Sequence, residues 1–334
     1  QALGYLKIYA DEVHTLEKTS DQVDSPLIGK LTKEDVLTQY SEVFKPGRDK
    51  SLGEPLHIEM DPKVRPVHAP IRRVRIAKLD QVNEELRRLC EKGTIMPVSQ
   101  PTDWLSNMLV KEKPGGKIRI CFDPSQTINK AIKRPVYTIP PIEEKLPLLA
   151  NAKVFTIVDV TEAFHTIELD EPSSLLTTFQ GPNGRYRYTR MPFGISSGPE
   201  EYQRRQHEFL ENLKGMINIA DDICIFGCGN TKEEADQDHD KNLVALLDKC
   251  REFGLRLSAK KIQFKSKSVT FMGHNLTDKG VAPDPAKVMA ITEMPRPTNK
   301  AGVQRFLGMC QYLSKFTPNL SKRVLPLREL DSAS

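Results

Sequence analysis

Three carboxylates on apolar segments are the residues of this sequence best suited to metal chemistry. Asp221 and Asp222 are adjacent in MINIADDICIFG, where two short apolar runs flank them. Two like charges repel each other and resist burial, so this pair needs a cationic partner. Asp159 lies near the end of another apolar run, KVFTIVDV. Oxygen ligands without histidine or cysteine indicate magnesium or manganese.

The two acidic segments must be neighbours in one sheet for the three carboxylates to act together. Residues 153–160 are rich in β-branched side chains and predict a strand, whereas residues 216–227 predict a hairpin with the acidic pair at its turn. Two metal ions at the shared edge, roughly 3.5–4 Å apart, could stabilise the attacking and leaving oxygens of a phosphoryl displacement. An isolated acidic pair is more often an exposed turn, so the rest of the sequence must decide.

Turn residues and hydrophobic periodicity predict the elements around these strands. Residues 1–55 are polar and are interpreted as a linker with a short helix after Leu31, and the Pro-rich residues 283–298 indicate a boundary. We expect hairpins over residues 105–122 and 177–190, and helices from about Ala77 to Gly93, after Gly198–Pro199, from Thr231 to about Phe253, and over residues 303–313.

The charge of the chain is uneven. The formal net charge is +5, but residues 1–60 hold 7 Lys/Arg against 11 Asp/Glu, and residues 61–140 hold 16 against 8. The second, basic stretch suits a phosphate-contacting surface, although charge alone would favour an ordinary solvated face. The acidic run EEADQDHDKN is interpreted as a solvated helix face rather than a metal site.

Cysteine usage and hydropathy exclude several protein classes. The six cysteines form no C-x-x-C pair, so we interpret them as reduced, mostly buried thiols of an intracellular protein rather than zinc ligands. No apolar run approaches the roughly 18 residues that span a bilayer, and no signal peptide opens the chain. The chain begins at Gln1 rather than Met, which favours a fragment or a processed polyprotein.

Several motifs in sequence order extend this evidence from about residue 30 to about residue 330. They are IRICFDPSQTINKAIKRPVYTIP, VFTIVDVTEAFHTI, TTFQGPNGRYRYTRMPFGISSGPEEYQ, INIADDICIFG, LRLSAKKIQF, VTFMGH and GVAPDPAKVMAITEMPRPTNKAGVQRFLGMCQYLSKF. In order and spacing they resemble the reverse transcriptase of gypsy-type (Metaviridae) LTR retrotransposon Pol polyproteins.

This resemblance implies an α+β fold of the right-hand polymerase type, with an antiparallel palm sheet flanked by helices. The implied divisions are an N-terminal linker or extension (1–55), fingers with part of the palm (56–150), a palm with a fingers insertion near 165–190 (151–280), and a thumb (281–334). No protease triplet, RNase H segment or integrase zinc pattern is found in the sequence, so these domains are expected to be absent.

The resemblance also implies roles at the reaction centre. Asp159, the backbone of Val160, Asp221 and Asp222 would hold two Mg²⁺ ions, with Mn²⁺ as a possible substitute. Lys261 would be the general acid for the departing pyrophosphate, with Lys260 an equal competitor on spacing. Residues that would bind the dNTP are Lys113 and Arg119 at the triphosphate, Phe164 beneath the sugar, and Phe193 and Gly194 beneath the nucleotide.

Phe164 would exclude a ribose 2′-hydroxyl, although a core phenylalanine is the alternative interpretation. Lys113 and Arg119 could equally be solvated cations of a hairpin. Gln203 would face the template unless it is an ordinary surface residue of its helix. Further template and primer contacts would come from Phe271, Met272, Gly273 and His274 at the primer end, and from Gln304, Gly308 and Tyr312 on one helix face, where Gly308 could instead serve helix packing.

Two positions depart from the family pattern. Ile219 replaces an aromatic residue that many relatives have two positions before the paired aspartates, and activity is expected to survive because an apolar residue still packs the hairpin. The stretch DPSQTIN lacks a basic residue that many relatives carry, which leaves no basis for a role of Ser125.

The sequence therefore predicts an RNA- and DNA-templated DNA polymerase that adds dNTPs to a primer 3′-hydroxyl. Its expected partners are an RNA template, a DNA primer, the RNA/DNA hybrid, dNTPs and other Pol segments such as RNase H and integrase, with no membrane. The expected location is intracellular, in the cytoplasm or a virus-like particle. The alternatives are a domesticated or inactive copy that binds nucleic acid or a partner, and, less favoured because of Phe164, an RNA-templated RNA polymerase.

Overall fold

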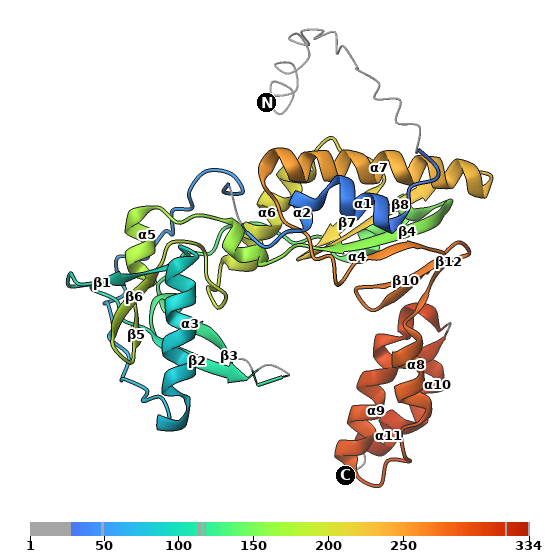
Figure 1. The fold of residues 1–334 in the computed structure, drawn as a ribbon. Helices are drawn as coiled ribbons and strands as arrows, with labels where there is room; N and C mark the ends of the chain where they lie inside the picture. Colours follow the sequence, from blue (N-terminus) through green and yellow to red (C-terminus); the bar gives the residue numbers. More distant parts are fainter. Residues whose placement is uncertain (1–27, 48–49, 113–114, 117, 318, 333–334) are drawn as a thin grey trace, which may run out of the picture.

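A four-stranded antiparallel sheet forms the centre of the computed structural model, which describes residues 28–332 except 48–49, 113–114, 117 and 318. The strand order is β7-β8-β4-β9. Helix α7 covers one face of this sheet (Figure 1). The bounds are β4 Ala152–Asp159, β7 Met216–Ile219, β8 Asp222–Cys228, β9 Gln263–Ser266 and α7 Lys232–Phe253.

Both faces of the central sheet are buried, which explains why its strands read as continuous apolar runs. Because side chains alternate along a strand, β4 contributes Val158 to the core beneath α7 and Phe155 and Ile157 to a second core on the opposite face. Thr231 and Glu234 form a capping box at the start of α7, and Gly254 ends the helix in a left-handed conformation. The predicted strand, hairpin and helix are thus confirmed.

A second antiparallel sheet of order β10-β11-β12 packs against the face of the central sheet opposite α7. Four helices follow it and extend away from both sheets (Figure 1). The helix predicted over residues 303–313 is confirmed as α9, whereas α8 lies within the stretch interpreted as a boundary. The bounds are β10 Ser268–Phe271, β11 His274–Thr277, β12 Gly280–Pro283, α8 Pro285–Thr292, α9 Lys300–Tyr312, α10 Leu320–Arg323 and α11 Leu325–Ser332.

A three-stranded sheet, β1-β6-β5, and the strand pair β2-β3 lie at the end of the molecule away from β10–β12 (Figure 1). The rings of Phe122, Phe179 and Tyr188 pack together there, with centroids 5.4–6.4 Å apart. Both predicted hairpins and the predicted helices are confirmed. The bounds are α3 Leu79–Glu91, β1 Ile95–Val98, β2 Asn107–Glu112, β3 Ile118–Asp123, α4 Ile142–Lys145, α5 Glu171–Leu176, β5 Phe179–Gly181, β6 Gly184–Tyr188 and α6 Gly198–Leu210.

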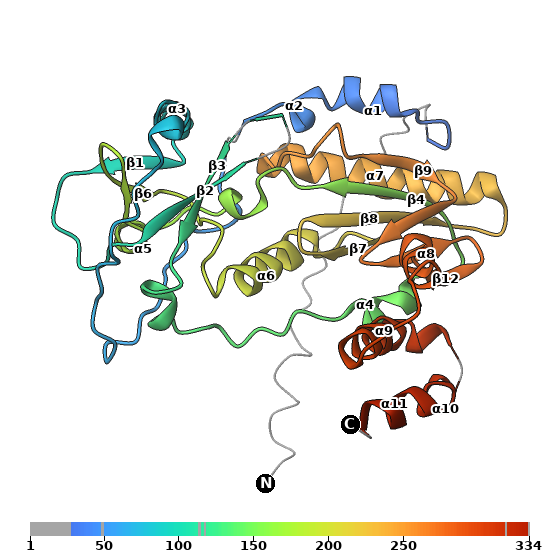
Figure 2. The ribbon, with the colours of Figure 1, turned by 90° about the horizontal axis from the view of Figure 1, so that it is seen from below.

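Two short N-terminal helices, α1 (Lys33–Gln39) and α2 (Ser41–Phe44), lie beside α7 (Figure 2). A fully buried carboxylate, Asp240 of α7, anchors the segment before them by accepting the backbone N–H groups of Gly29 at 2.8 Å and Leu31 at 3.2 Å. Lys265 Nζ also donates to Asp240, at 2.9 Å. The short helix after Leu31 is confirmed, and residues 1–27 lie outside the described part of the chain.

Two interpretations of the sequence were wrong. The run EEADQDHDKN is not wholly solvated, because His239 and Asp240 are both fully buried, with His239 bonded through Nε2 to Thr156 at 2.8 Å. All six cysteines are free, but only Cys224 and Cys250 are buried.

Among the described residues, no helix combines the length and apolar character that a membrane span requires.

Candidate active site

The three aspartates singled out in the sequence meet at one edge of the central sheet. Asp159 ends β4 and is the cross-strand partner of Asp222, the first residue of β8. The backbone N–H of Val160 donates to the carbonyl of Asp221 at 2.9 Å, which ties the two acidic segments together beyond the last strand pair. The carbonyl of Asp159 accepts the N–H of Ser258 at 2.9 Å. The backbone of all three acidic residues is therefore fixed by the sheet and its neighbours.

The electrostatics of this edge favour a bound cation. Burial, followed by the charge of Asp159, raises the pKa values of Asp221 and Asp222 above the ordinary range for aspartate. Lys261 opposes this shift. Its Nζ lies 2.6 Å from Oδ2 of Asp159, so a protein cation neutralises part of the acidic edge. Lys261 rather than Lys260 makes this contact.

The donor set fits a hard divalent ion. Three carboxylates with no histidine or thiolate among them are the ligands that magnesium and manganese prefer. Among the described residues, no three or more His, Cys, Asp or Glu side chains lie close enough together to form a metal-binding cluster. The carboxylate of Asp159 is instead paired with Lys261.

An aromatic platform lies next to the acidic edge. Phe164 packs against Phe193, with centroids 4.8 Å apart, and edge-on against buried Tyr202 at 5.6 Å. Phe193 is 38% exposed, so it lines a surface rather than the core. Gly194 has φ +106° and comes so close to Phe122 that an added Cβ would lie 2.8 Å from its carbonyl oxygen. This glycine is therefore required by both conformation and space.

Of the two cations predicted to bind the triphosphate, only Arg119 lies within the described residues. Arg119 lies on β3, opposite Lys111 of β2, and is exposed. Lys113 lies outside the described residues. The structure therefore describes the position of Arg119 alone.

The segment FMGH forms the turn between β10 and β11. Phe271 and His274 are buried, so neither side chain is available to a primer, whereas Met272 is 44% exposed. The carbonyl of Gly273 accepts the hydroxyl of Tyr312 at 2.8 Å, which joins α9 to this turn. The expected primer contacts thus reduce to Met272 and the backbone of the turn.

Helix α9 exposes Gln304 and Gly308, one turn apart. A Cβ added at Gly308 would meet nothing within 4 Å. Helix packing among the described residues therefore does not explain this glycine, and close approach of a partner remains the interpretation.

Gln203 does not face outward as expected. Its side chain is 1% exposed, and its Oε1 accepts the backbone N–H of Ala220 at 2.9 Å. The predicted direct template contact is therefore wrong for this structure. Sequence reasoning missed this support of the acidic hairpin because eight residues of α6 are buried, which leaves no clear outer face.

Sequence reasoning also missed the turn that follows Asp159. Glu162 adopts a left-handed conformation with φ 52°, directly before the 3-10 turn that carries Phe164. Its carboxylate lies 3.5 Å from Lys92 Nζ. No pattern in TEAF predicts this conformation, because a non-glycine residue with positive φ is uncommon.

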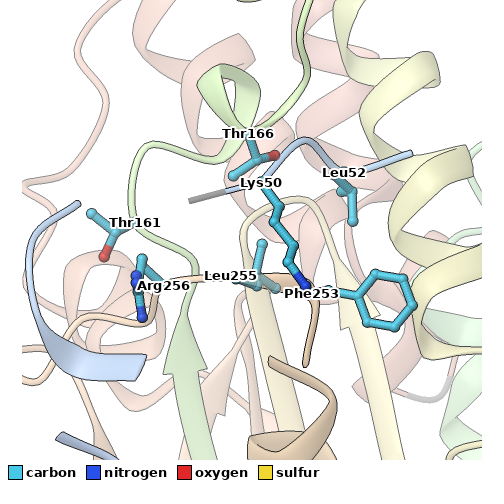
Figure 3. Close-up of a pocket in the computed structure, with 8 residues that line it drawn as sticks. Lys50, Leu52, Thr161, Thr166, Phe253, Leu255 and Arg256 are labelled. Atoms are coloured by element: carbon cyan, nitrogen blue, oxygen red, sulfur yellow. The ribbon is translucent and has the colours of Figure 1, made fainter. Parts of the chain in front are cut away.

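A small pocket lies beyond the C-terminal end of β4, the strand that ends at Asp159 (Figure 3). Its lining includes Lys50, Thr161, Phe253 and Arg256. The enclosed space, about 10 Å³, suits a single water molecule and not a nucleotide. Lys50 Nζ donates to the backbone carbonyl of Glu252 at 2.6 Å. The backbone N–H of Thr161 donates to the backbone carbonyl of Arg256 at 2.8 Å. These two hydrogen bonds hold the segments around the pocket together, and the pocket itself is too small to bind a nucleotide.

Comparison with known proteins identifies relatives that are similar in sequence to this chain. Residues 111–276 match the family model described as reverse transcriptase (RNA-dependent DNA polymerase). The chain is 30% identical over 331 residues to the retrovirus-related Pol polyprotein from transposon 412 of Drosophila melanogaster, covering 95% of this chain and 26% of that protein. It is 24% identical to the transposon Tf2-7 polyprotein of Schizosaccharomyces pombe, covering 98% and 25%. The chain thus spans about a quarter of the length of these relatives.

Solved structures share the fold. The foamy viral protease-reverse transcriptase dRH in complex with double-stranded DNA superposes with a TM-score of 0.78 at 21% identity, covering 91% of this chain and 54% of that one. The foamy viral protease-reverse transcriptase in complex with an RNA/DNA hybrid gives 0.72 at 20% identity, covering 91% and 41%. These likenesses confirm the predicted α+β right-hand polymerase fold.

Proposed function

Because this chain contains a domain of the reverse transcriptase family, we propose that it is an RNA- and DNA-templated DNA polymerase of a gypsy-type LTR retrotransposon. The observation that carries the proposal is the meeting of Asp159, Asp221 and Asp222 at one sheet edge beside an aromatic platform. A carboxylate cluster suits phosphoryl transfer, in which positioning and charge stabilisation supply most of the rate.

Asp159, Asp221, Asp222 and the carbonyl of Val160 would hold two magnesium ions. When bound, these ions would supply Lewis-acid stabilisation at the attacking and leaving oxygens. Phe164, held by Phe193 and Tyr202, would present its ring to the sugar and exclude a 2′-hydroxyl.

Lys261 would give its proton to the departing pyrophosphate, since its ammonium group is already beside Asp159. Lys113 and Arg119 would hold the triphosphate oxygens through charge-assisted hydrogen bonds. Met272 and the backbone of Gly273 would hold the primer end, with Gln304, Gly308 and Tyr312 along the duplex. Contacts of this kind follow backbone and shape, so binding would be salt-sensitive and nearly independent of sequence.

The foamy viral proteins of similar fold were solved with double-stranded DNA and with an RNA/DNA hybrid, which supports these duplexes as partners of this chain. The dNTPs are proposed as its substrates because the proposed reaction requires them. We propose that residues 56–150 are fingers with part of the palm, 151–280 are a palm with a fingers insertion near 165–190, and 281–334 are a thumb. The names of the Pol polyprotein relatives support assembly with other Pol segments such as RNase H and integrase. The proposed location is the cytoplasm or a virus-like particle.

Extension of a DNA primer on matched RNA and DNA templates, with dNTPs or rNTPs, tests the proposal. Polymerisation on both templates with a strong preference for dNTPs is the expected result. Tight binding of the primed duplex without incorporation would favour a binding module instead. A preference for rNTPs would point to an RNA polymerase.

A further inference from the structure

The turn that precedes the acidic pair contains a conformation that needs support. Ala220 connects β7 to the turn and has φ 51°, in the left-handed region. An L-residue with a Cβ pays a steric cost there that glycine does not. Because Asp221 and Asp222 follow directly, any relaxation of Ala220 would redirect both carboxylates.

Gln203 of α6 supplies that support. Gln203 is 1% exposed, and its Oε1 accepts the N–H of Ala220 at 2.9 Å in a partly buried hydrogen bond. Ala220 itself is exposed, so the bond acts by fixing the direction of its N–H, and loss of the acceptor would remove that restraint from the turn. The bond reaches the backbone of the turn itself, so it acts directly on the conformation of Ala220.

Helix α6 is a rigid platform for this contact. Arg205 and Glu201 form a buried ion pair at 2.6 Å, and Arg205 Nη1 donates to the carbonyl of Leu52 at 2.6 Å. One turn beyond Gln203, Gln206 accepts the side chain of Asn218 at 2.8 Å. Two buried glutamines of one helix thus bond the same hairpin, but only Gln203 bonds the turn.

We propose that Gln203 is a positioning residue that holds Ala220 in the left-handed conformation and thereby aims Asp221 and Asp222. This inference rests on the proposed function of the acidic edge as a metal-dependent polymerase centre. Gln203 touches no reacting atom, and its effect passes through the backbone of one residue.

The pair Gln203→Met and Gln206→Met provides a matched test. Both variants replace a buried amide with a flexible apolar chain of similar volume on the same helix. The double variant Gln203→Met/Ala220→Gly tests the mechanism, because glycine adopts positive φ without the steric cost. Mn²⁺ binding to the free protein, measured by electron paramagnetic resonance, gives a readout that does not need polymerase activity. Single-nucleotide extension gives kcat and KM separately.

The expected result for Gln203→Met is about tenfold weaker Mn²⁺ binding and about tenfold lower kcat, with the KM for dNTP within about twofold. Gln206→Met should lower the melting temperature comparably while leaving both quantities within about twofold of wild type. Ala220→Gly should restore most of the loss. Equal behaviour of the two glutamine variants, or failure of the glycine to rescue, would overturn the proposal.

Amide hydrogen exchange of the segment spanning residues 216–222 keeps the test valid if Gln203→Met does not fold. The Ala220 amide should be protected in the wild type, and rapid exchange there would overturn the proposal. If the wild type extends no primer, but the Mn²⁺ affinities of the wild type and the three variants still differ as expected, the polymerase function would be refuted and the positioning role would stand.

Discussion

Lys261 Nζ lies 2.6 Å from Oδ2 of Asp159, so the proposed general acid and a proposed metal ligand are paired with each other. The side chain of Lys261 is 65% exposed, which leaves it free to leave Asp159 when a divalent ion arrives. Lys260, its neighbour, makes no such contact. The structure therefore separates two lysines that spacing alone could not.

Replacement of each lysine tests this distinction. Lys261→Ala should lower the rate of nucleotide addition by about a hundredfold, as expected for loss of a general acid. Lys260→Ala, the matched control, should change it by less than about threefold. Single-turnover extension under saturating dNTP measures both. A larger loss for Lys260→Ala would reverse the assignment.

The acidic edge should destabilise the metal-free protein. The pKa of Asp222 is raised by burial and by Asp159, so its ionised form is disfavoured in the folded state. That cost grows as pH rises from the unfolded pKa through the higher folded pKa, and it is complete near neutral pH. Asp222→Asn should raise the melting temperature at pH 7 by about 2 °C, with no gain below about pH 4. A less stable Asn variant at neutral pH would contradict this explanation.

Asp240 should act in the opposite direction. Burial raises its pKa, but hydrogen bonds from His239 and Lys265 outweigh burial, so the pKa of Asp240 is lowered overall. Its stabilising contribution is therefore complete above the ordinary aspartate pKa and is lost as pH falls through the lower folded value.

Asp240→Asn should lower the free energy of unfolding by about 3 kcal/mol at pH 7, because Lys265 would lose its buried partner. Asp236→Asn is the control on the same helix. Its pair with exposed Lys232 is screened by solvent, so this substitution should have a much smaller effect. Urea unfolding at pH 7 and pH 3 measures both. Equal effects of the two substitutions would contradict the role given to Asp240.

Phe164 should set sugar selectivity. Phe164→Val removes the ring that would meet a 2′-hydroxyl and should raise the use of rNTPs relative to dNTPs by at least about tenfold. Phe164→Tyr keeps the ring and should keep the discrimination. The ratio of kcat/KM for matched nucleotides is the measurement. Unchanged selectivity in the valine variant would make Phe164 a core residue only.

Local sequence predicted the elements on which the reaction depends. The strand ending at Asp159, the hairpin around Asp221 and helix α7 were all predicted with bounds within a few residues, because continuous apolar runs and the Thr231–Gly254 caps are local signals. The α+β polymerase fold followed from the order of the motifs rather than from any single element.

Long-range partners were not predictable in the same way. His239 and Asp240 occupy an acidic stretch that resembles a solvated face, but their buried partners are distant in sequence. Asp240 accepts the N–H of Gly29, 211 residues away, and His239 bonds Thr156, 83 residues away. Gln203 was assigned to the template from the resemblance, and the pattern of α6 does not reveal which of its faces meets the hairpin. Both errors concern buried polar groups, whose partners no local pattern identifies.

The central claim is that Asp221 belongs to a metal-dependent polymerase centre. The most direct test compares the wild type with Asp221→Asn in the extension of a DNA primer on an RNA template with magnesium and dNTPs, while binding of the same primed duplex is measured in parallel. We expect extension by the wild type, none above background by Asp221→Asn, and comparable binding by both. Equal extension by both proteins, or binding without extension by either, would contradict the account.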